Sequence, residues 1–101
     1  MAKRTVVWTE TAAEQRREIL KYWLIRNKST TYPKKLIKLI ADRVKVIQSN
    51  PESFKLTNFP ETRVFAMEHF SILYKFTEAQ LIITAFWDNR QDPEKLAELI
   101  R

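Results

Sequence analysis

The residues best placed to do chemistry are Asp88, Asn89 and Arg90, which directly follow the apolar run 81–87. A run of this length, rich in β-branched and aromatic side chains, is typical of a strand that is covered on both faces. We expect this strand to deliver the three polar residues to a sheet edge, where a rigidly held arginine could contact a phosphate. The alternative is structural, because Arg90 could instead pair with Asp88 or Asp92 and secure the strand end.

Hydrophobic periodicity predicts the elements that must position Arg90. The first helix begins near Thr9 or Thr11, since either hydroxyl could cap it. Pro33 falls in the first turn of the second helix, where its missing amide costs nothing. An irregular connection is expected at 51–61, with Phe54, Leu56 and Phe59 as apolar anchors. The predicted elements are strands at 4–8, 63–68, 70–76 and from residue 81, and helices at 10–27, 33–49 and 93–100.

This order of elements, β-α-α-β-β-β-α, indicates an α+β fold. We expect a mainly antiparallel sheet with a helical hairpin packed on one face. A chain of 101 residues supports one core, so a single domain over 1–101 is predicted. In this arrangement Arg90 should project from the rim of the sheet into a positively charged hollow roofed by the two helices.

Composition narrows the classes of function. The chain has no cysteine and one histidine, so neither a metal nor a cofactor is expected. No apolar run approaches the length of a membrane span, and we therefore expect no membrane partner and a cytoplasmic location. A net charge of +6 favours a polyanionic or acidic partner. The lysine-rich second helix could dock on nucleic acid, although solvation of an amphipathic helix explains the same pattern.

Three segments resemble the RelE/ParE superfamily of bacterial toxins from toxin–antitoxin systems. The opening Val7-Trp-Thr-Glu-Thr-Ala-Ala13 is similar to the strand that enters a capped helix in this family. The strand pair from Arg63 to Tyr74 matches the middle of the family's fold. The closing Phe86-Trp-Asp-Asn-Arg-Gln-Asp-Pro-Glu-Lys-Leu96 is similar to the cluster that follows its last strand. The resemblance implies a toxin of a type II, plasmid-stabilization type of system.

Two activities are implied by this resemblance, since RelE-like members cleave mRNA on the ribosome and ParE-like members poison DNA gyrase. RelE-like cleavage would place Arg63, Lys75 and Arg90 in catalytic positions as charge stabilisers, with Lys55 as an alternative stabiliser and His69 as an acid. However, the arginine that usually precedes Leu-Val-Tyr is replaced by Ser71. The tail after Arg90 also lacks a tyrosine or histidine.

This depletion favours gyrase over mRNA as the target. The target-binding residues would then be Lys55, His69, Asn89 and Arg90. Arg63 has a structural alternative too, because it could pair with Glu61. The resemblance further implies a cognate antitoxin, an acidic or amphipathic helix that fills the groove beside the sheet in a hetero-oligomer. A ribosome-dependent endoribonuclease and a non-toxic antitoxin-binding module remain the alternatives.

Overall fold

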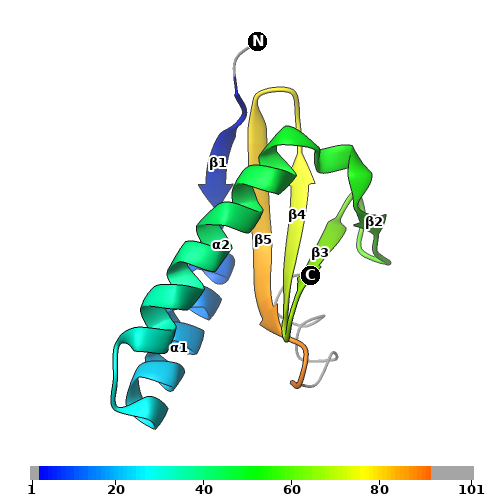
Figure 1. Ribbon diagram of the computed structural model, residues 1–101. Helices are drawn as coiled ribbons and strands as arrows, with labels where there is room; N and C mark the ends of the chain where they lie inside the picture. The colour runs from blue at the N-terminus through cyan, green and yellow to red at the C-terminus, as the bar shows by residue number, and fades with distance from the viewer. Residues whose placement is uncertain (1–2, 92–101) are drawn as a thin grey trace.

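The computed structural model describes residues 3–91 and has the predicted α+β architecture, with two helices against a five-stranded, mostly antiparallel sheet (Figure 1). The predicted helix at 93–100 lies outside the described residues. The elements are β1 (Thr5–Trp8), α1 (Glu10–Asn27), α2 (Thr31–Ser49), a 3-10 turn (Pro51–Ser53), β2 (Lys55–Leu56), β3 (Arg63–Met67), β4 (Phe70–Phe76) and β5 (Gln80–Asp88).

The strand order is β1-β5-β4-β3-β2, which makes β5 an interior strand between β4 and β1, the first strand of the chain. β1 runs parallel to β5, whereas the other neighbouring strands are antiparallel. The position of β5 explains its continuous apolar run, because it has a strand on each side and a covered surface on each face. Its carboxyl end carries Asp88 to the rim of the sheet, as predicted.

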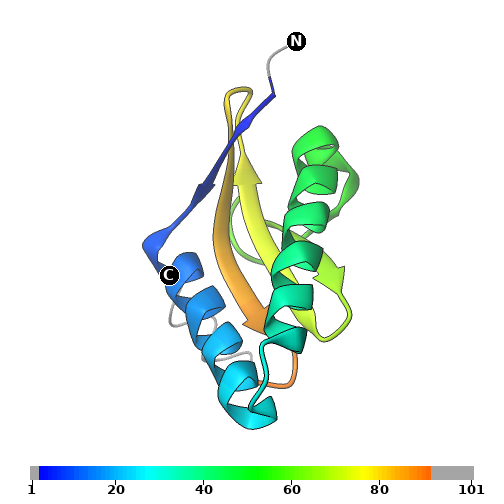
Figure 2. The same cartoon turned by 60° about the vertical axis from the view of Figure 1, so that its left-hand side comes forward.

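The two helices form an antiparallel hairpin on one face of the sheet (Figures 1 and 2). Thr9, rather than Thr11, caps α1, since its side chain accepts a hydrogen bond from the amide of Ala12. The helix α2 buries one stripe of side chains against the sheet, made of Pro33, Leu36, Ile40, Val44 and Ile47. Neither helix of the described part is long and apolar enough to cross a membrane.

The opposite face of the sheet carries a second, smaller cluster. Leu73, Ala85 and Trp87 are buried there, and Phe59 from the 51–61 connection packs against them. That connection is more ordered than predicted, because it contains the 3-10 turn and β2. The start of the connection is held from the helix-facing side, where the hydroxyl of Tyr74 donates a 2.6 Å hydrogen bond to the Pro51 carbonyl. Burial raises the pKa of Tyr74 to about 12, so this hydroxyl stays a donor at neutral pH.

Not every predicted anchor of the connection is buried. Phe54 packs on the main core and Phe59 on the smaller cluster, as expected. Leu56 is 56% exposed, so its prediction as an anchor is wrong. The reason is its place on β2, the two-residue edge strand, where only one neighbouring strand is present.

A bulge in β5 decides which side chains face the helices. Leu73 is opposite Ala85 and Tyr74 is opposite Ile83, so Thr84 is the extra residue. Because of this insertion, the helix-facing positions switch from Leu81 and Ile83 to Phe86 and Asp88.

Side chains from the start of α1 complete the hydrogen bonding at the bulge. Gln15 Oε1 accepts a hydrogen bond from the amide of Phe86 at 2.9 Å, and the hydroxyl of Thr9 donates to the Thr84 carbonyl at 3.4 Å. The helix start and the bulge therefore support each other.

Candidate target-binding rim

Arg90 lies just beyond β5 and is held by Asp88. Its Nε donates to Asp88 Oδ1 at 2.9 Å and its Nη2 donates to Asp88 Oδ2 at 2.6 Å, a bidentate ion pair. The guanidinium also lies 5.5 Å from the centre of the Trp23 ring on α1. Half of the side chain is exposed, and Nη1 is the terminal nitrogen that Asp88 does not engage. The structural pairing of Arg90 with Asp88 is thus present, and it fixes the orientation of the side chain.

The Asp88 carboxylate is nearly buried, with a side chain that is 12% exposed. Hydrogen bonds from the Arg90 guanidinium hold the pKa of this carboxyl below its usual value. Burial opposes that shift, while the amide of Arg90 and the nearby His69 assist it. Asp88 is therefore ionised at neutral pH and keeps Arg90 in one orientation.

This pairing predicts how stability depends on pH. Because the pKa of Asp88 is lowered by folding, its contribution is present above the unfolded-state pKa and is lost as pH falls through the folded-state pKa. We expect Asp88→Asn to lower the urea midpoint at pH 7, and the difference from the wild type to shrink as pH falls below about 4. Urea unfolding at several pH values checks this, and a difference that is independent of pH would contradict it.

Asn89 and His69 lie at the same end of the sheet as Arg90. The amide of Asn89 donates to the His69 carbonyl at 2.8 Å, and its side-chain oxygen accepts a 2.7 Å hydrogen bond from the hydroxyl of Ser71. His69 is exposed in the turn between β3 and β4, with Glu68 beside it at a positive φ of 53°. Three of the four predicted target-binding residues thus form one rim, which we call the Arg90 rim (Asp88, Asn89, Arg90 and His69).

Lys55, the fourth predicted target-binding residue, does not belong to the rim. It lies on the edge strand β2 opposite Val64, a residue of the smaller cluster, and therefore faces away from the helices. Lys75 also faces away from the helices, because it follows Tyr74 on β4. These two lysines share a face of the sheet but not the Arg90 rim.

Arg63 is on the helix-facing side, opposite Tyr74. Its Nη1 donates to the Phe54 carbonyl at 2.7 Å, which ties β3 to the preceding connection. On β4, Arg63 pairs with Tyr74, whereas Asp88 pairs with Phe70, four positions away. Arg63 and Asp88 are therefore separated by about 13 Å along the strand direction. The three arginine and lysine residues predicted for RNA cleavage are therefore not brought together.

The hollow beside Arg90 has a volume of about 430 Å³ and is lined by Tyr22 and Trp23 of α1. The carboxylates of Glu18 and Asp88 also line it. Arg90 lines a hollow, as predicted, but the prediction of a positively charged hollow is wrong, because two carboxylates share the space with one guanidinium. The prediction of a roof made by both helices is also wrong, since of these two helices only α1 contributes to the lining. Such a hollow suits a partner with both polar and aromatic contacts rather than a bare polyanion.

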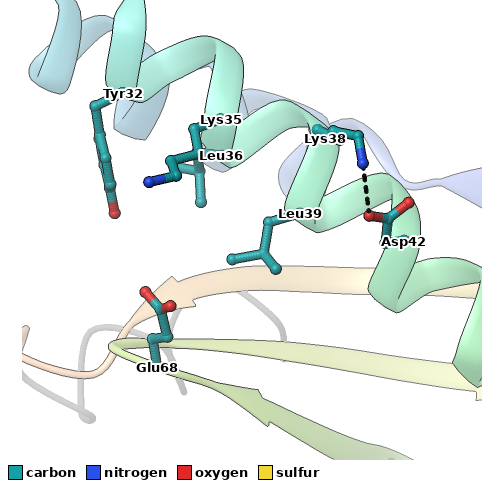
Figure 3. Close-up of a pocket in the computed structure, with 7 residues that line it drawn as sticks. All are labelled: Tyr32, Lys35, Leu36, Lys38, Leu39, Asp42 and Glu68. Atoms are coloured by element: carbon teal, nitrogen blue, oxygen red, sulfur yellow. Dashed lines mark ion pairs between the residues drawn. The ribbon is translucent and has the colours of Figure 1, made fainter.

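A second hollow, of about 350 Å³, lies between α2 and the β3–β4 turn (Figure 3). Tyr32 and Leu39 point into it from the helix, and Glu68 points toward them from the turn. Burial and, to a lesser degree, the Glu68 carboxylate raise the pKa of Tyr32, which keeps its hydroxyl protonated. Tyr32 also packs edge-on against Trp23 at 4.9 Å, so it connects this hollow with the Arg90 rim.

Sequence reasoning missed the part that the tip of the helical hairpin plays at the rim. Trp23 was expected in the apolar stripe of the first helix, which is true, but its ring also supports Arg90. Tyr22 and Tyr32 flank it from the end of α1 and the start of α2. The sequence did contain a signal for this role, because three aromatic residues flank the short connection between the two helices.

A larger and more apolar groove lies elsewhere, between α1, α2 and β1. We call it the hairpin groove, and its volume is about 560 Å³. Val6 and Trp8 of β1 and Leu20 and Ile37 of the helices provide its apolar surface, and Ile37 is 53% exposed. Basic side chains line it on both helices, namely Arg16, Arg17 and Lys45, and no carboxylate does so.

Comparisons with known proteins agree with this architecture. The protein family described as ParE toxin of type II toxin-antitoxin system, parDE, matches residues 6–93. A solved structure titled as a chromosomal ParDE TA system from P. aeruginosa superposes with a TM-score of 0.72. It is 19% identical, and the match covers 85% of this chain and 96% of the other, which shows a shared fold. No curated protein sequence matches.

Proposed function

Because the chain belongs to the ParE toxin family of type II toxin–antitoxin systems, we propose that it arrests growth by acting on DNA gyrase and that a cognate antitoxin neutralises it. The protein would act in the cytoplasm, where gyrase is found, as a single domain. In this proposal the Arg90 rim contacts gyrase and the hairpin groove receives the antitoxin.

The observation that carries the choice of gyrase over mRNA is the separation of the basic side chains. RNA cleavage without a metal needs groups that stabilise the phosphate charge and protonate the leaving oxygen at one point. Arg63 and Lys75 face opposite sides of the sheet, and Arg90 is neutralised by Asp88. This arrangement supports recognition of a protein surface by a fixed arginine, with aromatic residues beside it. It does not favour the ribosome-dependent endoribonuclease.

The hairpin groove supports the antitoxin half of the proposal. An amphipathic helix or extended segment could bury apolar side chains against Trp8 and Ile37 while its carboxylates meet Arg17 and Lys45. Such a segment would gain order only on binding, as disordered antitoxin tails do. The result is a hetero-oligomer in which charge complementarity guides association.

Controlled expression tests the proposed function. We expect growth arrest with gyrase-dependent DNA breaks, and inhibition of supercoiling by the purified protein and gyrase in vitro. Toeprinting on translating ribosomes should show uncut mRNA in the A site. Cleaved mRNA together with normal supercoiling would replace the proposal with the endoribonuclease, and harmless expression with tight antitoxin binding would select the non-toxic binding module.

The groove can be tested separately from the target. Ile37→Glu places a carboxylate among the groove's apolar side chains, and since Ile37 is 53% exposed the fold should tolerate it. We expect antitoxin affinity to fall by about tenfold or more, while gyrase inhibition is unchanged. Leu56→Glu is the matched control, because Leu56 is 56% exposed on β2, away from the groove. Equal effects of the two changes on antitoxin affinity would argue against the groove.

A further inference from the structure

We infer that the outer surface of α2 binds the phosphate backbone of duplex DNA without reading sequence. We define this outer basic face by three exposed residues of α2, Lys34, Lys38 and Lys45. The choice of DNA rests on the proposed function, since gyrase works on duplex DNA. The charge pattern itself does not depend on that proposal.

Helical spacing puts the basic residues of α2 on the side away from the sheet. The buried stripe of α2 includes Leu36 and Ile40, and Lys38 lies midway between them on the opposite side of the helix. Lys34 and Lys45 are four positions before and seven after Lys38, so they fall on the same surface. Over eleven residues this row extends about 16 Å, and B-DNA carries one phosphate charge per about 1.7 Å of axis.

The helix α1 carries charges of both signs on its exposed side, because Glu10 and Arg17 are seven residues apart, as are Glu14 and Lys21, and residues at this spacing share a side. Glu10, Glu14 and Glu18 recur every four residues and so share one side. Glu14 and Glu18 line hollows that also contain side chains of β5 and Gln91. Arg17 lines the hairpin groove together with Lys45 of α2. Because α2 has a single carboxylate, Asp42, the outer basic face is confined to α2. Figure 2 shows the two helices as neighbours that run in opposite directions.

Few carboxylates oppose this surface. The only ion pair that the described part of the chain forms on α1 or α2 joins Lys38 to Asp42, at 3.5 Å (Figure 3). Neither Lys34 nor Lys45 has such a partner among residues 3–91. Lys34 and Lys45 are exposed, and they would stay largely hydrated when they contact a phosphate. The cost of removing water from them on binding would therefore be small.

The position of the face favours nucleic acid over an acidic peptide. Lys34 and Lys38 do not line the hairpin groove, where the apolar side chains that would anchor a peptide lie, although Lys45 does. Lysines of this kind act as point charges on phosphates and carry no base readout. Binding should therefore be independent of sequence and strongly dependent on salt.

Fluorescence anisotropy with the purified full chain and a labelled 20-base-pair duplex tests the inference. We expect binding whose affinity falls steeply as salt rises and is the same for unrelated duplexes. The variant Lys34→Gln/Lys45→Gln should lower affinity by about tenfold or more at low salt and reduce the slope of log affinity against log salt by about 2. The change keeps helix propensity and avoids the Lys38–Asp42 pair.

The matched control is Lys55→Gln/Lys75→Gln, which removes the same charge from the face of the sheet that points away from the helices. It should change affinity less than about threefold. Equal loss in both variants, absence of duplex binding, or equally tight binding to polyglutamate would overturn the inference. Tighter binding to RNA than to DNA would overturn it as well.

Failure of this inference can be told apart from failure of the proposed function. Supercoiling assays measure gyrase inhibition, whereas the anisotropy assay contains no gyrase. Intact gyrase inhibition without duplex binding would remove only the DNA face. Duplex binding without gyrase inhibition would remove the proposed target and leave the basic face in place.

Discussion

Replacing Arg90 with alanine will weaken inhibition of DNA gyrase by about tenfold or more, because an arginine held in one orientation beside aromatic residues has the features of a binding hot spot. Asp88 and Trp23 already fix the guanidinium, so little side-chain entropy is lost when a partner binds the exposed edge. The measurement is the concentration of purified variant that halves gyrase supercoiling. Under controlled expression, cells that produce Arg90→Ala should form more colonies than cells that produce the wild type.

Two further variants test whether the effect of Arg90→Ala comes from the geometry of this side chain or only from the loss of a positive charge. Arg90→Lys keeps the charge but cannot form the bidentate pair, so its inhibition should be intermediate. Arg43→Ala removes an exposed arginine of α2 that lines neither the hollow beside Arg90 nor the hairpin groove, and it should inhibit like the wild type. Equal inhibition by Arg90→Ala and wild type, with both shown folded by circular dichroism, would remove Arg90 from the target-binding surface.

Phe86→Ala is expected to cost about 3–5 kcal/mol of the free energy of unfolding. Phe86 is fully buried, and its ring stacks on Phe70 at 5.3 Å and meets the edge of Trp8 at 6.4 Å. It therefore joins β5 to the strands on both sides of it, and its loss leaves a cavity directly before Asp88. Chemical denaturation of the purified protein measures the change.

A loss of this size is a large part of the stability of a typical small domain, so the variant should also be less toxic in cells. Leu56→Ala provides the control for hydrophobic truncation, since Leu56 is mostly exposed on the edge strand, and its effect should be below about 0.5 kcal/mol. A cost below about 1 kcal/mol for Phe86→Ala would mean that the core between β1 and β4 relaxes around the missing ring.

Much of the fold could be predicted from local patterns in the sequence. The first helix covers the predicted residues 10–27, and the strand of Phe70 to Phe76 has its predicted limits. Both follow from periodicity and polar boundaries within a single element, which are local properties. The two-residue strand β2 was not predicted, because Lys55 and Leu56 form a strand only through pairing with β3.

The candidate site was only partly predictable. The sequence places Asp88, Asn89 and Arg90 together at the end of a buried strand, and their adjacency in the chain makes that conclusion secure. The participation of His69 depends on the turn between two strands, which periodicity also indicates. The charge of the hollow could not be predicted, because Glu18 comes from a helix far away in the sequence.

By itself, the sequence determined the two helices α1 and α2, the four longer strands and the polar end of β5, since these depend on side-chain types at short spacing. Only the tertiary structure decided where that end points. The extra residue Thr84 reverses the alternation of β5, so that Asp88 faces the helices and Trp87 the opposite side. Gln15 and Thr9 of the distant helix start bond to the bulged backbone. Such a bulge depends on hydrogen bonds between segments about seventy residues apart, which no local pattern records.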